Sequence, residues 1–285
     1  MRTYRGNCHC GAVVFEAELP EITSVHECNC SICHKKGYLG LFPHADAFRF
    51  VKGSDVDMTS YTFGPKKLVH KFCPTCATPL MAEFVDAPPE KRWVLNARAI
   101  QGLDLWNFPR EHFDGTKLGD VYEPPAYQGA LPSAAATDTD TKLYTGSCHC
   151  GRVGVALVSK PLDETFDERR VECNCSICER NAYYWIYPAR SQVVLAGDEA
   201  DIGRYAFARR FLTKTFCRVC GVAMTNDANP KQDEVPADLQ AGLAEWTTKH
   251  HPVNLRVFPD VDLARLKPAE RFDGATKLPP AYVNP

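Results

Sequence analysis

The sequence lacks the features that would place it in a membrane, in a secretory route or on a nucleic acid. No apolar run approaches the roughly 18–20 residues that cross a bilayer. The first residues, MRTYRG, contain no apolar signal-peptide core. With 33 basic and 35 acidic residues the formal net charge is −2, so no excess of positive charge favours nucleic acid. We therefore expect a cytoplasmic protein that binds neither membranes nor nucleic acids; its oligomeric state is not predicted.

Cysteine, by contrast, is abundant. The chain has 14 cysteines, and a cytoplasmic compartment makes disulfides a poor explanation for them. They form two sets of seven in the same order, CxC, CxCxxC and CxxC, with none left over. The first set is Cys8, Cys10, Cys28, Cys30, Cys33, Cys73 and Cys76, and the second is Cys148, Cys150, Cys173, Cys175, Cys178, Cys217 and Cys220.

The repetition extends beyond cysteine and indicates a tandem duplication. YRGNCHCG near the start is matched by YTGSCHCG in the second half, and FDGTKL is matched later by FDGATKL. Self-similarity over most of a chain indicates two copies of one domain. We predict a first copy at 1–127 and a second at 142–285 with an insertion near 229–250. The small and polar residues at 128–141 read as a linker.

Hydrophobic patterning predicts the all-β class. Apolar and polar residues alternate in short runs such as 13–19, and frequent Gly and Pro interrupt these runs. We expect two small tandem β domains with few helices, each stapled by metal. One helix is predicted in the insertion, over 236–246, because Leu239, Leu243 and Trp246 recur at helical spacing.

Seven thiols per copy divide naturally into four and three. A structural zinc takes four protein ligands, whereas a reactive zinc commonly keeps three and leaves one position for water or substrate. The CxC and CxxC pairs can supply four sulfurs, and the CxCxxC cluster can supply three. We predict two Zn²⁺ per domain and up to four per chain. The four-sulfur sites are Cys8, Cys10, Cys73 and Cys76, and Cys148, Cys150, Cys217 and Cys220; the open sites are Cys28, Cys30 and Cys33, and Cys173, Cys175 and Cys178.

Histidine offers no shared catalytic group. Of nine histidines only His9 and His149 recur in both copies, and each lies between two predicted ligands, so its side chain should point away from the metal. Any chemistry therefore falls to zinc. An alternative stays open, in which all the zincs only hold the fold and His34 or a water completes the first middle site.

A polar pair recurs near the end of each copy. Asn96 and Arg98, like Asn254 and Arg256, alternate with apolar residues on a predicted strand, so both side chains of a pair should share one face. Such a pair either holds the fold or forms a fork that binds a substrate carboxylate.

The order CHCG, CNCSIC, FCxxC and then a strand with Asn and Arg resembles the glutathione-dependent formaldehyde-activating enzymes, a family that includes centromere protein V-like members. The resemblance covers both copies outside the linker and the insertion. It implies a β-tent fold with one structural and one catalytic zinc per domain, on the same four-plus-three ligands. It also implies a carbon–sulfur lyase-type reaction that joins glutathione and formaldehyde as S-(hydroxymethyl)glutathione.

Each copy departs from the family pattern, so the two pockets should differ. Tyr184 and Trp185 in the second copy replace Leu39 and Gly40 in the first, and Ala77 stands where the second copy keeps glycine. Our main hypothesis is a zinc-dependent carbon–sulfur lyase acting on a small-molecule thiol, with glutathione as the candidate. Two alternatives remain: a zinc enzyme of specialised metabolism acting on a larger substrate without glutathione, and a non-catalytic zinc-scaffolded binding module.

Overall fold

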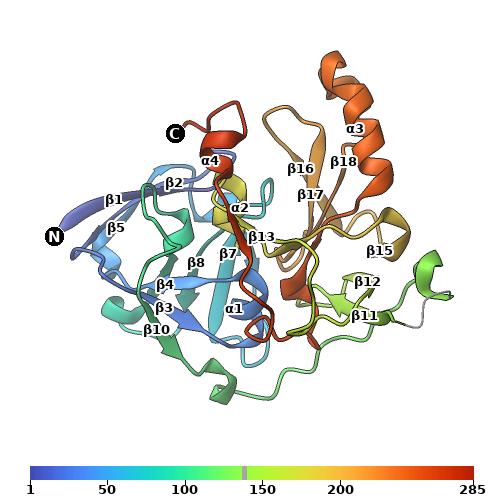
Figure 1. Cartoon of the computed structure of the whole chain (residues 1–285). Coiled ribbons are helices and arrows are strands. Elements are labelled where there is room, and N and C mark those ends of the chain that lie inside the picture. The colour runs from blue at the N-terminus through green and yellow to red at the C-terminus, as the bar shows by residue number, and fades with distance from the viewer. Residues whose placement is uncertain (137–139) are drawn as a thin grey trace. The chain divides into compact units, whose positions relative to one another are not determined.

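The computed structural model describes residues 1–136 and 140–285 (Figure 1). Residues 137–139 of the predicted linker lie outside this description. Contacts between Cα atoms divide the chain into two units. Unit 1 comprises Met1–Glu123, Glu179–Ala182 and Tyr282–Pro285, and unit 2 comprises Pro124–Cys178 and Tyr183–Ala281. The copy boundaries expected from the sequence stay a prediction.

The first copy is built on two sheets. The smaller sheet has three strands in the order β1 (Arg2–Asn7), β2 (Val14–Leu19) and β5 (Phe48–Lys52). The larger sheet has seven, in the order β10 (Arg110–Phe113), β3 (Val25–Cys28), β4 (Leu39–Leu41), β9 (Trp93–Asn96), β8 (Pro79–Phe84), β7 (Leu68–Phe72) and β6 (Thr59–Tyr61). The β10–β3 pair is parallel, and the other pairs are antiparallel. Helix α1 (Ser31–Lys36) follows β3.

The second copy repeats this topology strand for strand. Its smaller sheet is β11 (Lys142–Ser147), β12 (Val153–Ser159) and β15 (Val193–Gly197). Its larger sheet is β16 (Ile202–Ala206), β17 (Leu212–Cys217), β18 (Ala223–Ala228), β19 (Val253–Asn254), β14 (Trp185–Ile186), β13 (Arg170–Cys173) and β20 (Glu270–Phe272). Its helices are α2 (Ser176–Asn181), α3 (Ala237–Lys249) and α4 (Gly274–Lys277).

The predicted fold class is confirmed. Both halves consist mainly of β-sheet, and the α-helices of the described residues are the four short ones α1 to α4. In β2 the alternation works as expected: Phe15, Ala17 and Leu19 are buried, while Glu18 faces solvent. Strand β12 differs, because all of its residues are buried and it belongs to the core on both faces. Among the described residues, no helix has the length and apolar character needed to cross a membrane.

The helix predicted in the insertion is present as α3. Of the three apolar residues that predicted it, the side chains of Leu239 and Leu243 lie outside the described part of the structure. The third, Trp246, stacks on the imidazole of His250, with ring centroids 5.2 Å apart. This contact is made one turn from the end of the helix and fixes the exit of the chain toward β19.

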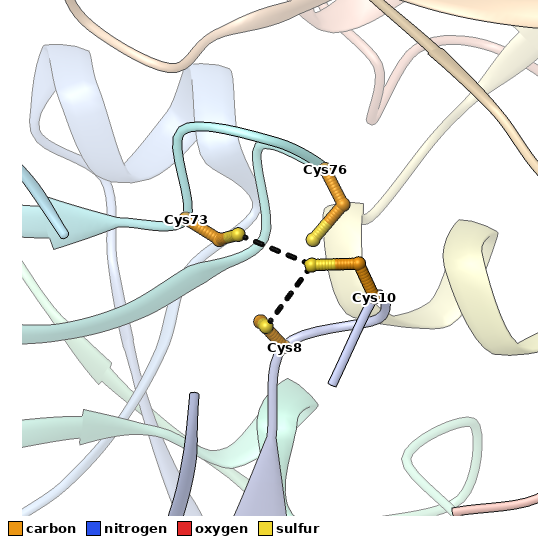
Figure 2. Close-up of side chains that lie close together, drawn as sticks. All are labelled: Cys8, Cys10, Cys73 and Cys76. Carbon is orange, nitrogen blue, oxygen red and sulfur yellow. Dashed lines mark hydrogen bonds between the residues drawn. The ribbon is translucent and has the colours of Figure 1, made fainter. Parts of the chain in front are cut away.

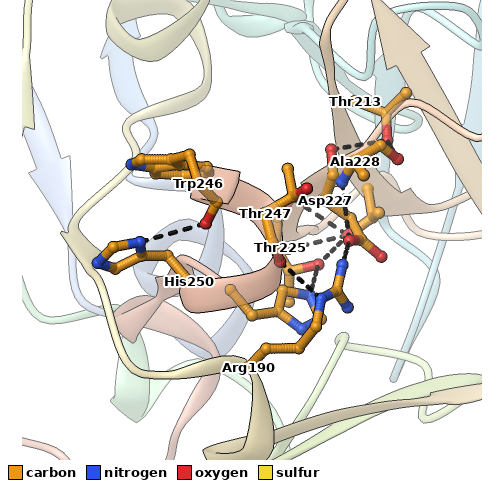
Figure 3. Close-up of polar contacts among 10 residues, drawn as sticks. Arg190, Thr213, Thr225, Asp227, Ala228, Trp246, Thr247 and His250 are labelled. Atoms are coloured by element: carbon orange, nitrogen blue, oxygen red, sulfur yellow. Dashed lines mark hydrogen bonds and ion pairs between the residues drawn. The ribbon is translucent and has the colours of Figure 1, made fainter. Parts of the chain in front are cut away.

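A polar network fastens the C-terminal end of α3 to the larger sheet of unit 2 (Figure 3). Arg190 donates from Nε to the carbonyl oxygen of Thr247, at 2.8 Å, and forms an ion pair with Asp227 of β18. Just beyond the helix, His251 is buried, and its Nε2 lies 3.2 Å from Oγ1 of Thr225. Burial lowers the pKa of His251 to about 4, so its imidazole is neutral at neutral pH.

Candidate metal centres

Four cysteines of the first copy converge between its two sheets. Cys8 and Cys10 lie in the turn that joins β1 to β2, and Cys73 and Cys76 lie in the turn that joins β7 to β8. Figure 2 shows their sulfur atoms facing one another; all four lie within 4.8 Å. Sγ of Cys10 is 3.6 Å from that of Cys8 and 3.5 Å from that of Cys73. Four thiolates at about 2.3 Å from a tetrahedral zinc would stand about 3.8 Å apart, so this donor set fits the ion.

The matching cysteines of the second copy have the same geometry. The four sulfurs of Cys148, Cys150, Cys217 and Cys220 lie within 4.8 Å of one another. The Sγ–Sγ distance is 3.6 Å between Cys148 and Cys150, and 3.5 Å between Cys150 and Cys217. In each copy the first cysteine also accepts a hydrogen bond from a main-chain N–H five residues later, at 3.3 Å. Such bonds hold a sulfur in place and stabilise its thiolate form.

A left-handed residue closes the second turn of each four-cysteine cluster. Ala77 has φ of +59° and Gly221 has φ of +71°, and each N–H donates to the carbonyl oxygen of Cys73 or Cys217. Glycine adopts this conformation without steric cost, whereas a Cβ adds about 1 kcal/mol. The departure at Ala77 therefore leaves the turn intact and strains it locally.

The remaining cysteines form one triad in each copy. In the first copy Cys28 ends β3, Cys30 precedes α1 and Cys33 lies in its first turn, and their sulfurs lie within 4.8 Å of one another. Cys173 and Cys178, with the cysteine between them, repeat this at the junction of β13 and α2. Among the described residues no histidine nitrogen or carboxylate oxygen joins either triad within that distance. Each triad therefore offers three thiol donors.

Electrostatics of the first triad fit a cation. Hydrogen bonds from Cys30 and Cys33 lower the pKa of Cys28 to about 3. The hydrogen bond with Cys28 raises the pKa of both Cys30 and Cys33. Ionisation of the first thiol of the triad is thus favoured, while ionisation of the second and third is disfavoured. Three thiolates at this spacing require a positive charge among them, which a bound metal ion supplies.

A glycine from the repeated FDG motif packs directly against each triad, which the sequence reasoning missed. A Cβ added at Gly115 would lie 2.3 Å from Sγ of Cys28 and 2.9 Å from Cβ of Cys30. In the second copy, a Cβ at Gly274 would lie 2.4 Å from Sγ of Cys173. Only a residue without a side chain fits this position. The repetition of FDG in both copies was the available signal.

Parallel pairing of β10 with β3 places this motif, because Phe113 stands opposite Cys28 in the register. Asn29 then holds the motif: its Nδ2 donates to Oδ1 of Asp114, at 3.0 Å, and its Oδ1 accepts from the N–H of Thr116, at 3.3 Å. Hydrogen bonds from Thr116 and Asn29 lower the pKa of Asp114 to about 2. The asparagine inside CNC is therefore a clasp, which joins the loop that carries the triad to the end of the copy.

The second copy has the same clasp. Nδ2 of Asn174 donates to Oδ1 of Asp273, at 2.9 Å, and Oδ1 of Asn174 accepts from the N–H of Ala275, also at 2.9 Å. The hydrogen bonds from Thr276 and Asn174 lower the pKa of Asp273. Both triads therefore rest on the same support.

The recurring Asn and Arg do not share a strand face, so that expectation is wrong. Strand β9 ends at Asn96, and residues 97–99 form a 3₁₀ turn; residues 255–257 do so in the second copy. Oδ1 of Asn96 accepts from the N–H groups of Leu39 and Arg98, both at 3.3 Å, and Nδ2 donates to the carbonyl oxygen of Pro79, at 2.7 Å. A capping asparagine competes with the strand for main-chain hydrogen bonds, which ends the two-residue period.

The second pair behaves alike. Asn254 is fully buried; its Oδ1 accepts from the N–H groups of Tyr184 and Arg256, and its Nδ2 donates to the carbonyl oxygen of Ala223. In the first copy, Arg98 donates from Nε to the carbonyl oxygen of Gly37, at 2.6 Å. Gly37 caps α1, so this guanidinium lies beside the helix that carries Cys33.

The wall of the second triad is aromatic. The indole N–H of Trp185 donates to Sγ of Cys178, at 3.5 Å. Tyr183 stacks on Trp185 with ring centroids 4.3 Å apart, and Nζ of Lys214 lies 4.6 Å from the centroid of the indole. Trp185 is 3% exposed and Cys178 is 5% exposed. In the sequence, Trp185 stands out as the residue that replaces Gly40 of the first copy.

Fold and site together define a class: a tandem β protein in which each copy brings one four-cysteine and one three-cysteine cluster into metal-binding range. The family model described as glutathione-dependent formaldehyde-activating enzyme matches residues 3–105 and 143–259. The chain belongs to this family, with two tandem copies. A solved crystal structure, of a Rhodobacter sphaeroides protein, is 30% identical to it; the match covers 38% of this chain and 99% of that chain, with a TM-score of 0.33.

Proposed function

We propose that this protein is a cytoplasmic zinc enzyme of carbon–sulfur lyase type that joins a small thiol, with glutathione as the candidate, to formaldehyde. The observation that carries the proposal is the division of each copy's sulfurs into a set of four and a set of three. A set of four fills the coordination shell of a tetrahedral zinc, and a set of three leaves one position for a substrate atom.

The four-cysteine clusters would hold structural zinc. In the first copy, Cys8, Cys73 and Cys76 are buried, and the cluster joins a turn of the smaller sheet to a turn of the larger one. A small domain with a thin core gains much of its folding free energy from such a centre. Two zincs per copy give four per chain.

The triads would hold the reactive zinc. A zinc bound there would lower the pKa of a substrate thiol and so favour its thiolate form. The thiolate sulfur attacks the carbon of formaldehyde, a carbon–sulfur bond forms, and the carbonyl π electrons move to oxygen. That oxygen takes up the proton that the thiol released, which yields an S-hydroxymethyl adduct. The protein's own part is to hold three sulfurs in place, through the clasp of Asn29 with Asp114 and its counterpart in the second copy.

Arg98 and Arg256 are proposed to bind a carboxylate of the thiol substrate. The contact of Arg98 with Gly37 places the guanidinium beside α1, and a guanidinium matches the two oxygens of a carboxylate. Asn96 and Asn254 are given a fold-holding role instead, because their polar atoms bond to the main chain. Replacing Arg98 by Gln should raise KM for the thiol more than it lowers kcat.

Two measurements test the proposal. Metal analysis of the intact protein should find four zincs per chain, and two or fewer would refute the four-plus-three division. Calorimetric titration with glutathione should show binding that the combined replacement of Cys30 and Cys175 by Ser abolishes. An absence of binding even at high glutathione concentration would discard the thiol chemistry and leave the specialised-metabolism enzyme or the binding module.

A further inference from the structure

We propose that the two triads serve different purposes: a substrate thiol reaches the triad of the first copy, whereas Trp185 closes the triad of the second copy to it. This inference rests on the proposed thiol chemistry and specifies where in the chain that chemistry takes place.

The strand register shows that Trp185 occupies the position of Gly40. Gly40 stands opposite Asn96 in the β4–β9 pair, and Trp185 stands opposite Asn254 in the β14–β19 pair. Gly40 also pairs with His26, which lies two residues before Cys28 in β3. Residues two apart in a strand share a face, so a side chain at this position projects from the face that carries the first sulfur of the triad.

In the first copy no side chain takes this place. Gly40 is itself buried, and a Cβ there would lie 3.2 Å from Cγ1 of Val94, but the neighbouring side chains of His26 and Phe42 are 44% and 48% exposed. Cys33, the third cysteine of the triad, is itself partly exposed. A molecule from solvent can therefore contact Cys33 and the half-exposed side chains of His26 and Phe42 beside it.

In the second copy the same face is filled. Val171, which replaces His26, is buried, and the indole of Trp185 extends over Cys178 with its N–H on the sulfur. The indole is held in this position by the stacked ring of Tyr183 and by the ammonium group of Lys214, which lies over the indole ring. The indole must leave this packed position before a peptide-sized thiol can approach Cys178. Cys173 and Cys175 stay partly exposed, as Cys28 and Cys30 do. The copies therefore differ at the third sulfur, which is partly exposed in the first triad and lies buried beneath the indole in the second.

Exchange of the two residues tests the inference in the full-length chain. The protein is loaded with Co²⁺, whose absorption bands report a new thiolate ligand, and titrated with glutathione. We expect one equivalent bound per chain in the wild type, two in Trp185→Gly and none in Gly40→Trp. Tyr184→Leu, which restores the first-copy residue next to Trp185, is the matched control and should still bind one.

The outcomes separate this inference from the proposed function. Two equivalents in the wild type, or one that survives in Gly40→Trp, would overturn the inference and leave the thiol chemistry standing. No response in the wild type and in Trp185→Gly alike would refute the thiol chemistry, and the inference with it. If Gly40→Trp fails to fold, labelling of the wild-type holoprotein with iodoacetamide decides: Cys33 should be alkylated before Cys178, and equal rates would count against the closure.

Discussion

Replacement of Gly115 by Ala is the most direct test of how the first triad is held. The new Cβ would stand 2.3 Å from Sγ of Cys28, whereas an ordinary carbon–sulfur contact is about 3.7 Å, so one of the two must move by more than 1 Å. Metal–ligand distances tolerate only about 0.2 Å. The φ angle of Gly115 is not positive, so the expected effect of the substitution is steric and does not come from backbone strain. We expect the affinity of this triad for metal to fall about 10–100-fold, as when other residues that orient ligands are lost.

The assay is a competition titration of the intact protein against a chromogenic chelator. Gly115→Ala should weaken one metal equivalent per chain, and Gly274→Ala should weaken a different one, because its Cβ would lie 2.4 Å from Sγ of Cys173. Gly242→Ala is the control, since nothing lies within 4 Å of a Cβ there. Unchanged affinity in Gly115→Ala, with the protein folded, would refute the reasoning that this glycine positions the triad.

Three further predictions concern stability. Ala77→Gly should raise the free energy of unfolding by about 0.5–1 kcal/mol through relief of its positive φ, while Gly221→Ala should lower it; chemical denaturation compares the two. Because the pKa of His251 falls from 6.5 to about 4 on folding, the unfolded chain binds the extra proton between these pH values. Above about pH 6.5 protonation of His251 costs the folded state nothing, and between pH 6.5 and pH 4 the free energy of unfolding falls by about 3 kcal/mol because of this group. His251→Gln should remove this pH dependence when the two proteins are denatured in parallel over the same pH range. Cys76→Ser should unfold the first copy, as seen by circular dichroism, whereas Cys30→Ser should leave its fold intact; equal unfolding by both would make the triad structural.

Spacing and repetition in the sequence were enough to predict the clusters and the tandem copies. Cys28, Cys30 and Cys33 are close together in the chain, so one loop can bring their sulfurs together. The two-residue alternation also predicted the all-β class. These features depend on local order and on chemistry that few residue types can perform.

Features that depend on long-range pairing could not be predicted. Nothing local to FDG shows that β10 pairs in parallel with β3, and without that pairing Gly115 has no visible relation to Cys28. The alternation around Asn96 was misleading because of a local interaction: the side chain of Asn96 caps the turn formed by residues 97–99, so the strand ends there. The contact between Trp185 and Cys178 could not be predicted either, because the sequence does not show the direction in which the indole turns.

The clasp between Asn29 and Asp114 also bears on the order in which the protein is assembled during synthesis. These residues are separated by 85 positions, and their counterparts in the second copy by 99. The cysteines of each triad are made early in their copy and close together, but the segment that supports them is made near the end of that copy. A nascent chain therefore exposes three unsupported thiols for most of the time that each copy is being made. Metal delivered late, after residues 113–115 or 272–274 have been added, meets a finished site rather than a loose loop.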